Sequence, residues 1–67
     1  MAPGEIVKVI ETHFGVGDYG KTHILYPGVE GLVIENYYDI ETLLLLISGS
    51  LIEVEEQAVE ICNEENR

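Results

Sequence analysis

Several residue types are scarce in this chain of 67 residues, and each shortage narrows what the protein can do. Cys62 is the only cysteine, so no disulfide can form within one chain. Only 3 lysines and arginines stand against 13 aspartates and glutamates, which gives a formal charge of −10. Because proteins bind nucleic-acid phosphates mainly through lysine and arginine, this composition argues against direct binding to nucleic acid. The same charge argues against binding to an anionic membrane.

Groups that could support catalysis or hold a metal ion are also few. His13 and His23 flank a glycine-rich stretch that contains Asp18, and a histidine beside a carboxylate can transfer protons or bind a metal. The chain has no further histidine, and the position of Cys62 does not complete a zinc-type spacing. We therefore predict a non-enzymatic protein with no catalytic residues, no metal and no cofactor.

Long apolar runs are missing as well. The longest run, Leu43 to Ile47, is far shorter than the roughly 20 residues that a membrane-spanning helix needs. The first residues show neither the basic nor the apolar segment of a signal peptide. A single cysteine is typical of proteins in reducing compartments. Together these features predict a cytoplasmic protein.

The remaining sequence is dominated by short segments with the composition of strands. β-Branched and apolar residues gather in segments that glycine, proline or polar residues separate. The expected strands are residues 5–11, 29–38, 43–47, 51–54 and 59–62. Glycines at positions 15, 17, 20 and 28 predict a long ordered loop over residues 12–28, with a short strand over residues 23–26 inside it. Residues 55–58 predict a short 3₁₀ turn before the last strand.

A helical alternative competes with this prediction in the second half of the chain. Ser50 and Glu53 match a helix capping box, and apolar residues at 51, 54, 58 and 61 follow helical spacing. Asp39 could likewise cap a helix that Gly49 ends. However, apolar residues alternate with glutamate over residues 52–54 and 59–61, as they do in half-buried strands. We therefore prefer the all-β prediction.

Four segments carry a resemblance to a known fold. Residues 4–10 look like the opening strand of SH3-like small barrels, including the KOW family, and residues 28–33 are similar to the glycine-x-x-glycine-x-valine step into their second strand. Residues 43–54 and 56–61 resemble their closing hairpin, 3₁₀ turn and last strand. The resemblance implies a five-stranded SH3-like barrel over residues 4–62, with a long first loop, an N-terminal extension (1–3) and an acidic tail (63–67).

The same resemblance bears on function and origin. Many KOW domains bind nucleic acid, but the acidic charge contradicts that role here. Small acidic chains of this build also resemble proteins of tailed bacteriophages. That likeness implies a viral protein in the cytoplasm of a host cell or in the virion.

The third expected strand is apolar on both faces. Leu43, Leu45 and Ile47 would point one way, and Leu44 and Leu46 the other. Because a small barrel has one core, one set, Leu44 and Leu46 or the other, should face outward and form a patch for a partner. Tyr37 and Tyr38 would extend this patch, since tyrosine is favoured at interfaces. The alternative is that the glycine-rich loop or a terminal segment covers that face.

Acidic residues near the end of the chain suggest a second kind of contact. Glu53, Glu55, Glu56 and Glu60 would form either a solvated face or a docking surface for a basic protein. We therefore predict a protein–protein interaction and assembly module, either as a homo-oligomer or as a component of a larger particle. The alternative prediction is an acidic inhibitor or nucleic-acid mimic that docks on a basic protein surface.

Overall fold

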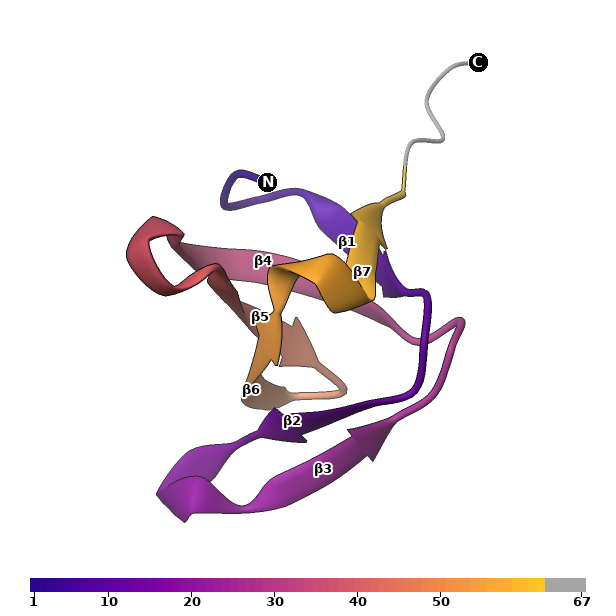
Figure 1. Cartoon of the computed structure of the whole chain (residues 1–67), viewed down its shortest axis with the longest axis vertical. Helices are drawn as coiled ribbons and strands as arrows, with labels where there is room; N and C mark the ends of the chain where they lie inside the picture. Colours follow the sequence, from indigo (N-terminus) through magenta and orange to yellow (C-terminus); the bar gives the residue numbers. More distant parts are fainter. Residues whose placement is uncertain (63–67) are drawn as a thin grey trace.

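The computed structural model describes residues 1–62 and contains a single antiparallel sheet of seven strands. In chain order the strands are β1 (Ile6–Val9), β2 (His13–Val16), β3 (Thr22–Leu25), β4 (Glu30–Tyr37), β5 (Thr42–Ile47), β6 (Ser50–Glu55) and β7 (Val59–Ile61). The connections include the 3₁₀ helices η1 (Asp18–Gly20), η2 (Tyr38–Ile40) and η3 (Glu56–Ala58). Across the sheet the order is β3-β2-β6-β5-β4-β1-β7 (Figure 1).

The sheet is open, so the predicted five-stranded SH3-like barrel is wrong. Strands β3 and β7 form the two edges of the sheet and do not pair with each other (Figure 1). The difference arises in residues 12–28, where the expected long loop is a hairpin of β2 and β3 that lengthens the sheet beyond β6. The all-β prediction is confirmed, whereas the helical alternative is wrong, because residues 1–62 contain no α-helix.

Glycine misled the sequence prediction at β2. A Cβ atom at Gly15 would lie 2.5 Å from Cγ2 of Ile52 in β6 and 3.2 Å from Cδ1 of Leu25 in β3. Only glycine lets β2 approach the neighbouring strands this closely. Gly15 therefore serves close packing inside a strand, whereas the sequence prediction read it as part of a loop.

The other expected elements are confirmed with small shifts of their ends. The strands expected at 5–11, 29–38, 43–47, 51–54 and 59–62 are β1, β4, β5, β6 and β7, and the short strand expected at 23–26 is β3. The expected 3₁₀ turn before the last strand is η3. Between β5 and β6, Ser48 and Gly49 have φ angles of 51° and 82°. Positive φ at both central residues is what a type I′ hairpin turn requires.

One apolar cluster lies on the inner face of the curled sheet. Each strand alternates, so that Val7 and Val9 of β1 point inward, as do Leu43, Leu45 and Ile47 of β5. Leu25 of β3 and Val59 of β7 belong to the same cluster, although they come from the two edges of the sheet. The sheet therefore wraps around its core without closing, and the other inner residues are Val33, Ile52, Val54 and Ala58.

The residues before β1 are attached to β4. The backbone N–H of Gly4 donates to the carbonyl of Val33 at 2.8 Å, and Nδ2 of Asn36 donates to the carbonyl of Met1 at 2.6 Å. The Met1 side chain packs against the core. The predicted extension (1–3) thus lies along the sheet, while the predicted acidic tail (63–67) lies outside the described residues. In the part of the chain that the structure describes, no helix is long and apolar enough to cross a membrane.

Candidate protein interface

A row of apolar side chains crosses the outer face of the sheet. Strand register places Leu51 of β6 opposite Leu46 of β5, Leu46 opposite Leu32 of β4, and Leu32 opposite Ile6 of β1. Side chains directly opposite one another lie about 5 Å apart between their Cβ atoms, so these residues form a continuous strip, here called the outer stripe. Leu51, Leu46 and Ile6 are 40%, 38% and 42% exposed, and Leu32 is half-buried.

A bulge in β4 widens the outer stripe. The register between β4 and β5 shifts between Val33 and Glu35, so Ile34 is an extra residue at this point. Bulges of this kind bend a strand and redirect a side chain. Ile34 is 36% exposed, and Leu44 of β5, which faces outward next to Leu46, is half-buried. Together they add apolar surface beside Leu32 and Leu46.

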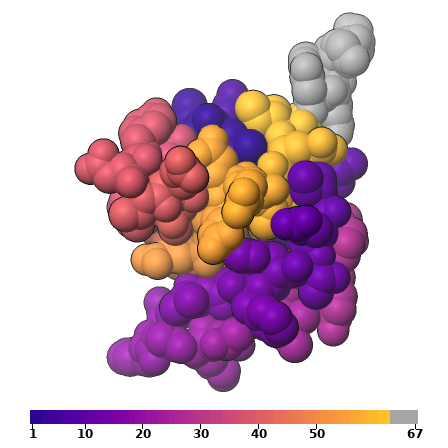
Figure 2. All heavy atoms as spheres, in the orientation of Figure 1, coloured from indigo at the N-terminus to yellow at the C-terminus, as the bar shows by residue number. Residues whose placement is uncertain are grey.

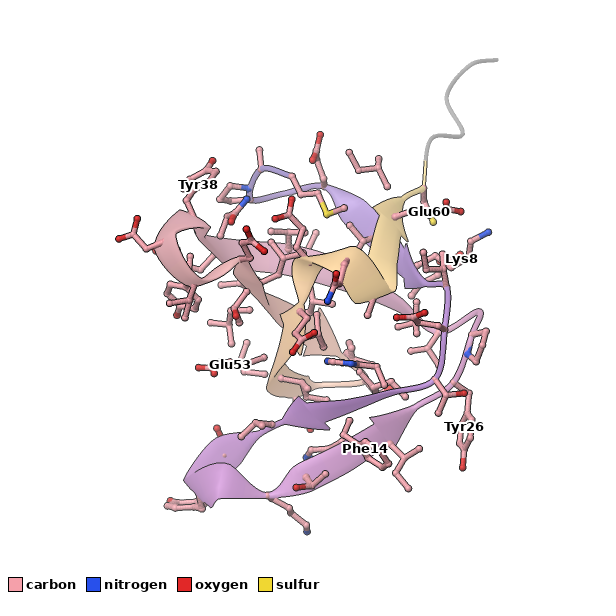
Figure 3. The ribbon with its side chains drawn as sticks, in the orientation of Figure 1. Lys8, Phe14, Tyr26, Tyr38, Glu53 and Glu60 are labelled. Carbon is pink, nitrogen blue, oxygen red and sulfur yellow. The ribbon has the colours of Figure 1, made fainter. Side chains whose placement is uncertain are left out.

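Acidic residues border the outer stripe on both sides. On one side, Leu44 lies between Glu35 of β4 and Glu53 of β6. On the other side, Lys8 of β1 lies between Glu30 of β4 and Glu60 of β7; Figure 3 shows Lys8 and Glu60 together at the β1–β7 end and Glu53 near β6. The single lysine leaves both borders acidic. The arrangement is an apolar centre with a polar rim, which is the usual anatomy of a protein interface.

The structure places the predicted partner-binding residues in different surroundings. Leu46 belongs to the outer stripe, and Leu44 lies beside it. Tyr37 is opposite Thr42 on the same outer face, at the far end of β4, and is 37% exposed. Tyr38 is 74% exposed in η2 and lies away from the stripe at one corner of the molecule (Figure 3).

The predicted acidic residues do not form one cluster. Glu53 lies beside Leu44, and Glu55 lies opposite Thr42 farther along the same face. Glu56 is half-buried in η3, where its backbone N–H donates to the carbonyl of Glu41 at 3.0 Å. Glu60 is on β7, on the other side of the stripe. In Figure 2 the residues coloured as 50–62 cover the centre and upper right of the face shown. The strand register places Glu53 and Glu55 on β6 and Glu60 on β7, so these glutamates do not gather at one place.

The two histidines have local structural contacts. Nε2 of His13 accepts a hydrogen bond from the backbone N–H of Glu55 at 3.2 Å, which links β2 to the end of β6. His23 is half-buried beside Gly17, where a Cβ would lie 2.6 Å from its Nε2. Among residues 1–62, no three or more histidine, cysteine, aspartate or glutamate side chains are grouped to hold a metal ion.

A hollow on the described part of the surface is small for a small-molecule site. A hollow of about 200 Å³ is lined by Ile40, Glu41, Thr42, Glu55 and Gln57. Ligand pockets usually enclose about 300–1,000 Å³ and are largely apolar. This hollow is smaller than that range, and its lining is mostly polar. The outer stripe is therefore the better candidate site.

The sequence prediction missed the residues that complete the outer stripe. Ile6, Leu32 and Leu51 were assigned to strands, but not to a shared surface. The sequence does indicate that some apolar residues of these strands face outward, because β4 and β6 each contain consecutive apolar residues that must point to opposite faces. Bringing them into one row requires the register between neighbouring strands, which no single strand encodes.

Comparison of the chain with protein-family models, with curated proteins and with solved structures found no match. The resemblance to SH3-like and KOW barrels is contradicted by the open sheet. The likeness to tailed-phage proteins likewise finds no relative among these comparisons.

Proposed function

We propose that the protein is a non-enzymatic interaction module that binds another protein through the outer stripe. The observation that carries this proposal is the alignment of exposed apolar residues from neighbouring strands in one row. Soluble proteins rarely leave a contiguous apolar patch in water unless it meets a partner. A rigid sheet also holds these side chains in fixed positions, so binding costs little conformational entropy.

The acidic borders define the chemistry of the partner. Glu35 and Glu53 lie on one side of the stripe, and Glu30 and Glu60 on the other. A fitting partner presents an apolar ridge with lysine or arginine on both flanks. Complementary charges at a rim speed association and fix the orientation, while the buried apolar centre supplies most of the affinity.

The acidic surface also supports the second candidate function, docking on the basic surface of a nucleic-acid-binding protein. The distribution of carboxylates favours the first candidate, because they border an apolar centre and are interrupted by Lys8. A mimic of nucleic acid would depend on its carboxylates and not on the leucines. The two candidates therefore differ in which residues binding requires.

Selection from a displayed peptide library tests the proposal, with the intact chain as bait. We expect enriched peptides to combine apolar residues with flanking lysine or arginine. The double variant Leu46→Gln/Leu51→Gln should lose at least about tenfold in affinity for them, as interface centres do when truncated. The control is Ile61→Gln, since Ile61 is 44% exposed on β7 opposite Val7, a residue of the inner face.

Three outcomes would count against the outer stripe. One is the absence of any enriched peptide. Another is equal loss of affinity in the Ile61→Gln control. The third is enrichment of uniformly basic peptides that bind the double variant normally and compete with DNA, which would support the acidic inhibitor instead.

A further inference from the structure

The β3 edge of the sheet has unused backbone hydrogen-bonding groups. In the β2–β3 hairpin, the N–H of Gly17 donates to the carbonyl of Lys21 at 2.7 Å. Because hydrogen-bonded and non-hydrogen-bonded pairs alternate along an antiparallel ladder, the next pair, Val16 with Thr22, is non-hydrogen-bonded, and so is Phe14 with Ile24. The N–H and C=O groups of Thr22 and Ile24 therefore point away from β2, toward the open edge.

This edge lacks the features by which proteins protect exposed strands. Edges are usually blocked by charged side chains, proline, bulges or very short strands. The sequence of β3 is Thr-His-Ile-Leu, with no aspartate, glutamate, lysine, arginine or proline, and its pairing with β2 is regular. The opposite edge, β7, is a three-residue strand that carries Glu60.

The hairpin is also the electrically neutral part of the molecule. Residues 12–29 contain one acidic residue, Asp18, and one lysine, Lys21, with no arginine. The whole excess of ten negative charges therefore lies elsewhere in the chain. Two copies of such an acidic protein repel each other over most of their surfaces, and the hairpin is where this repulsion is weakest.

Exposed apolar side chains cover the outer face of the hairpin. Phe14, Ile24 and Val16 are 63%, 52% and 44% exposed, and Phe14 lies opposite Ile24. Tyr26, which follows β3, is 59% exposed. Figure 3 shows Phe14 and Tyr26 at the hairpin side of the molecule, apart from Glu53 and Glu60. These residues are separate from the outer stripe.

We infer that β3 pairs antiparallel with β3 of a second copy of this chain, which joins the two sheets into one across a two-fold axis. The outward-pointing groups set the register. Thr22 pairs with Ile24 of the copy, Ile24 pairs with Thr22 of the copy, and His23 lies on the axis. This register matches hydrogen-bonding positions on both strands and pairs three of the four residues of β3, while Leu25 faces Lys21 of the copy.

Side-chain rows continue across the seam in this arrangement. On the outer face, Phe14 and Ile24 of one protomer are followed by Thr22 and Val16 of its partner. The two-fold axis produces a second, equivalent row in which the two protomers exchange roles. No carboxylate of β2 or β3 lies in either row. The contact therefore gains backbone hydrogen bonds and apolar burial without bringing acidic groups together.

The pairing would also support the hairpin itself. The register between β2 and β6 contains a single pair, Val16 with Glu53, and an isolated two-stranded hairpin is only marginally stable in water. A copy of β3 would make each hairpin interior to a larger sheet. This inference uses a different surface from the outer stripe, so either proposal can fail without the other.

Analytical ultracentrifugation over a wide concentration range tests the dimer. Thr22→Pro removes an N–H that points away from β2, so the monomer keeps its β2–β3 ladder. We expect the variant to weaken dimerisation at least about tenfold, since the two-fold axis removes the hydrogen bond twice. Thr22→Val keeps the N–H and should dimerise like the original chain. Because screening reduces the repulsion between acidic protomers, added salt should tighten the dimer.

Amide hydrogen exchange provides a second measurement that does not depend on a variant. We expect the amides of Thr22 and Ile24 to become more protected as concentration rises, while that of His23, which faces β2, changes less. A monomer at every concentration would overturn the inference. So would concentration-independent exchange at Thr22 and Ile24, a dimer that Thr22→Pro leaves unchanged, or a dimer that Leu46→Gln/Leu51→Gln abolishes.

Discussion

Replacing Gly15 with alanine directly tests how closely β2 packs against β6. The new Cβ would lie 2.5 Å from Cγ2 of Ile52 and 3.2 Å from the carbonyl oxygen of Glu53. Neither atom can move aside easily, because Ile52 is only 3% exposed and the oxygen belongs to the backbone of β6. Overpacking a core costs about 1–3 kcal/mol, while the stiffer unfolded chain offsets about 0.4–1 kcal/mol. We expect a net loss of about 1–2 kcal/mol in the free energy of unfolding.

Thermal and urea denaturation measure this loss. In a domain of this size, 1 kcal/mol lowers Tm by about 4–8 °C. Gly17→Ala is the matched control, because its Cβ would meet the imidazole of His23, which can rotate away. Ile52→Leu removes the obstructing Cγ2 methyl group, so the double variant Gly15→Ala/Ile52→Leu should lose about 1 kcal/mol less than the sum of the single variants. A neutral Gly15→Ala, or strictly additive losses, would refute the close packing of β2 on β6.

Two further predictions concern the β5–β6 hairpin. Leu45 is fully buried, whereas Leu46 next to it is 38% exposed. In urea denaturation, the free energy of unfolding should therefore fall by about 2–5 kcal/mol for Leu45→Ala and by under about 1 kcal/mol for Leu46→Ala. Equal losses would contradict the assignment of the two residues to opposite faces. Ser48→Asn should raise the free energy of unfolding by about 0.5 kcal/mol, because asparagine before glycine suits the positive φ angles of this turn. An unchanged or lower Tm would count against that turn geometry.

Strands could be predicted from the sequence where apolar and polar residues alternate. The prediction was wrong at β2, where a glycine can indicate either a turn or close packing of two strands. Alternation placed β1 and β6 correctly because one face of each is buried. Gly15 looks the same in sequence whether it serves a turn or a close approach, and its role depends on Ile52, a residue distant in the chain. A closed barrel would require the two edge strands of the sheet to pair with each other. Here β2 and β3 extend the sheet beyond β6, so the edges are β3 and β7, which do not pair.

The candidate site was partly predictable for a similar reason. Consecutive apolar residues in β5 indicated that one set of side chains, Leu44 and Leu46 or the other, faces away from the core, and in the structure it is Leu44 and Leu46. The rest of the outer stripe required the register that aligns Ile6, Leu32 and Leu51 with Leu46. Local composition gives the faces of a strand, but only long-range pairing shows which residues meet across strands.

The distribution of charge suits the two proposed surfaces to different partners. If two outer stripes met, Glu53 and Glu35 of one copy would approach acidic borders of the other, and the contact would be unfavourable. The β3 edge carries no such borders, so the proposed self-association would occur there and would leave both stripes uncovered. A dimer joined through β3 would then present two stripes in a fixed relation. For a partner with repeated binding sites, the second contact becomes intramolecular, and the overall affinity rises beyond that of one stripe when the geometry allows both contacts.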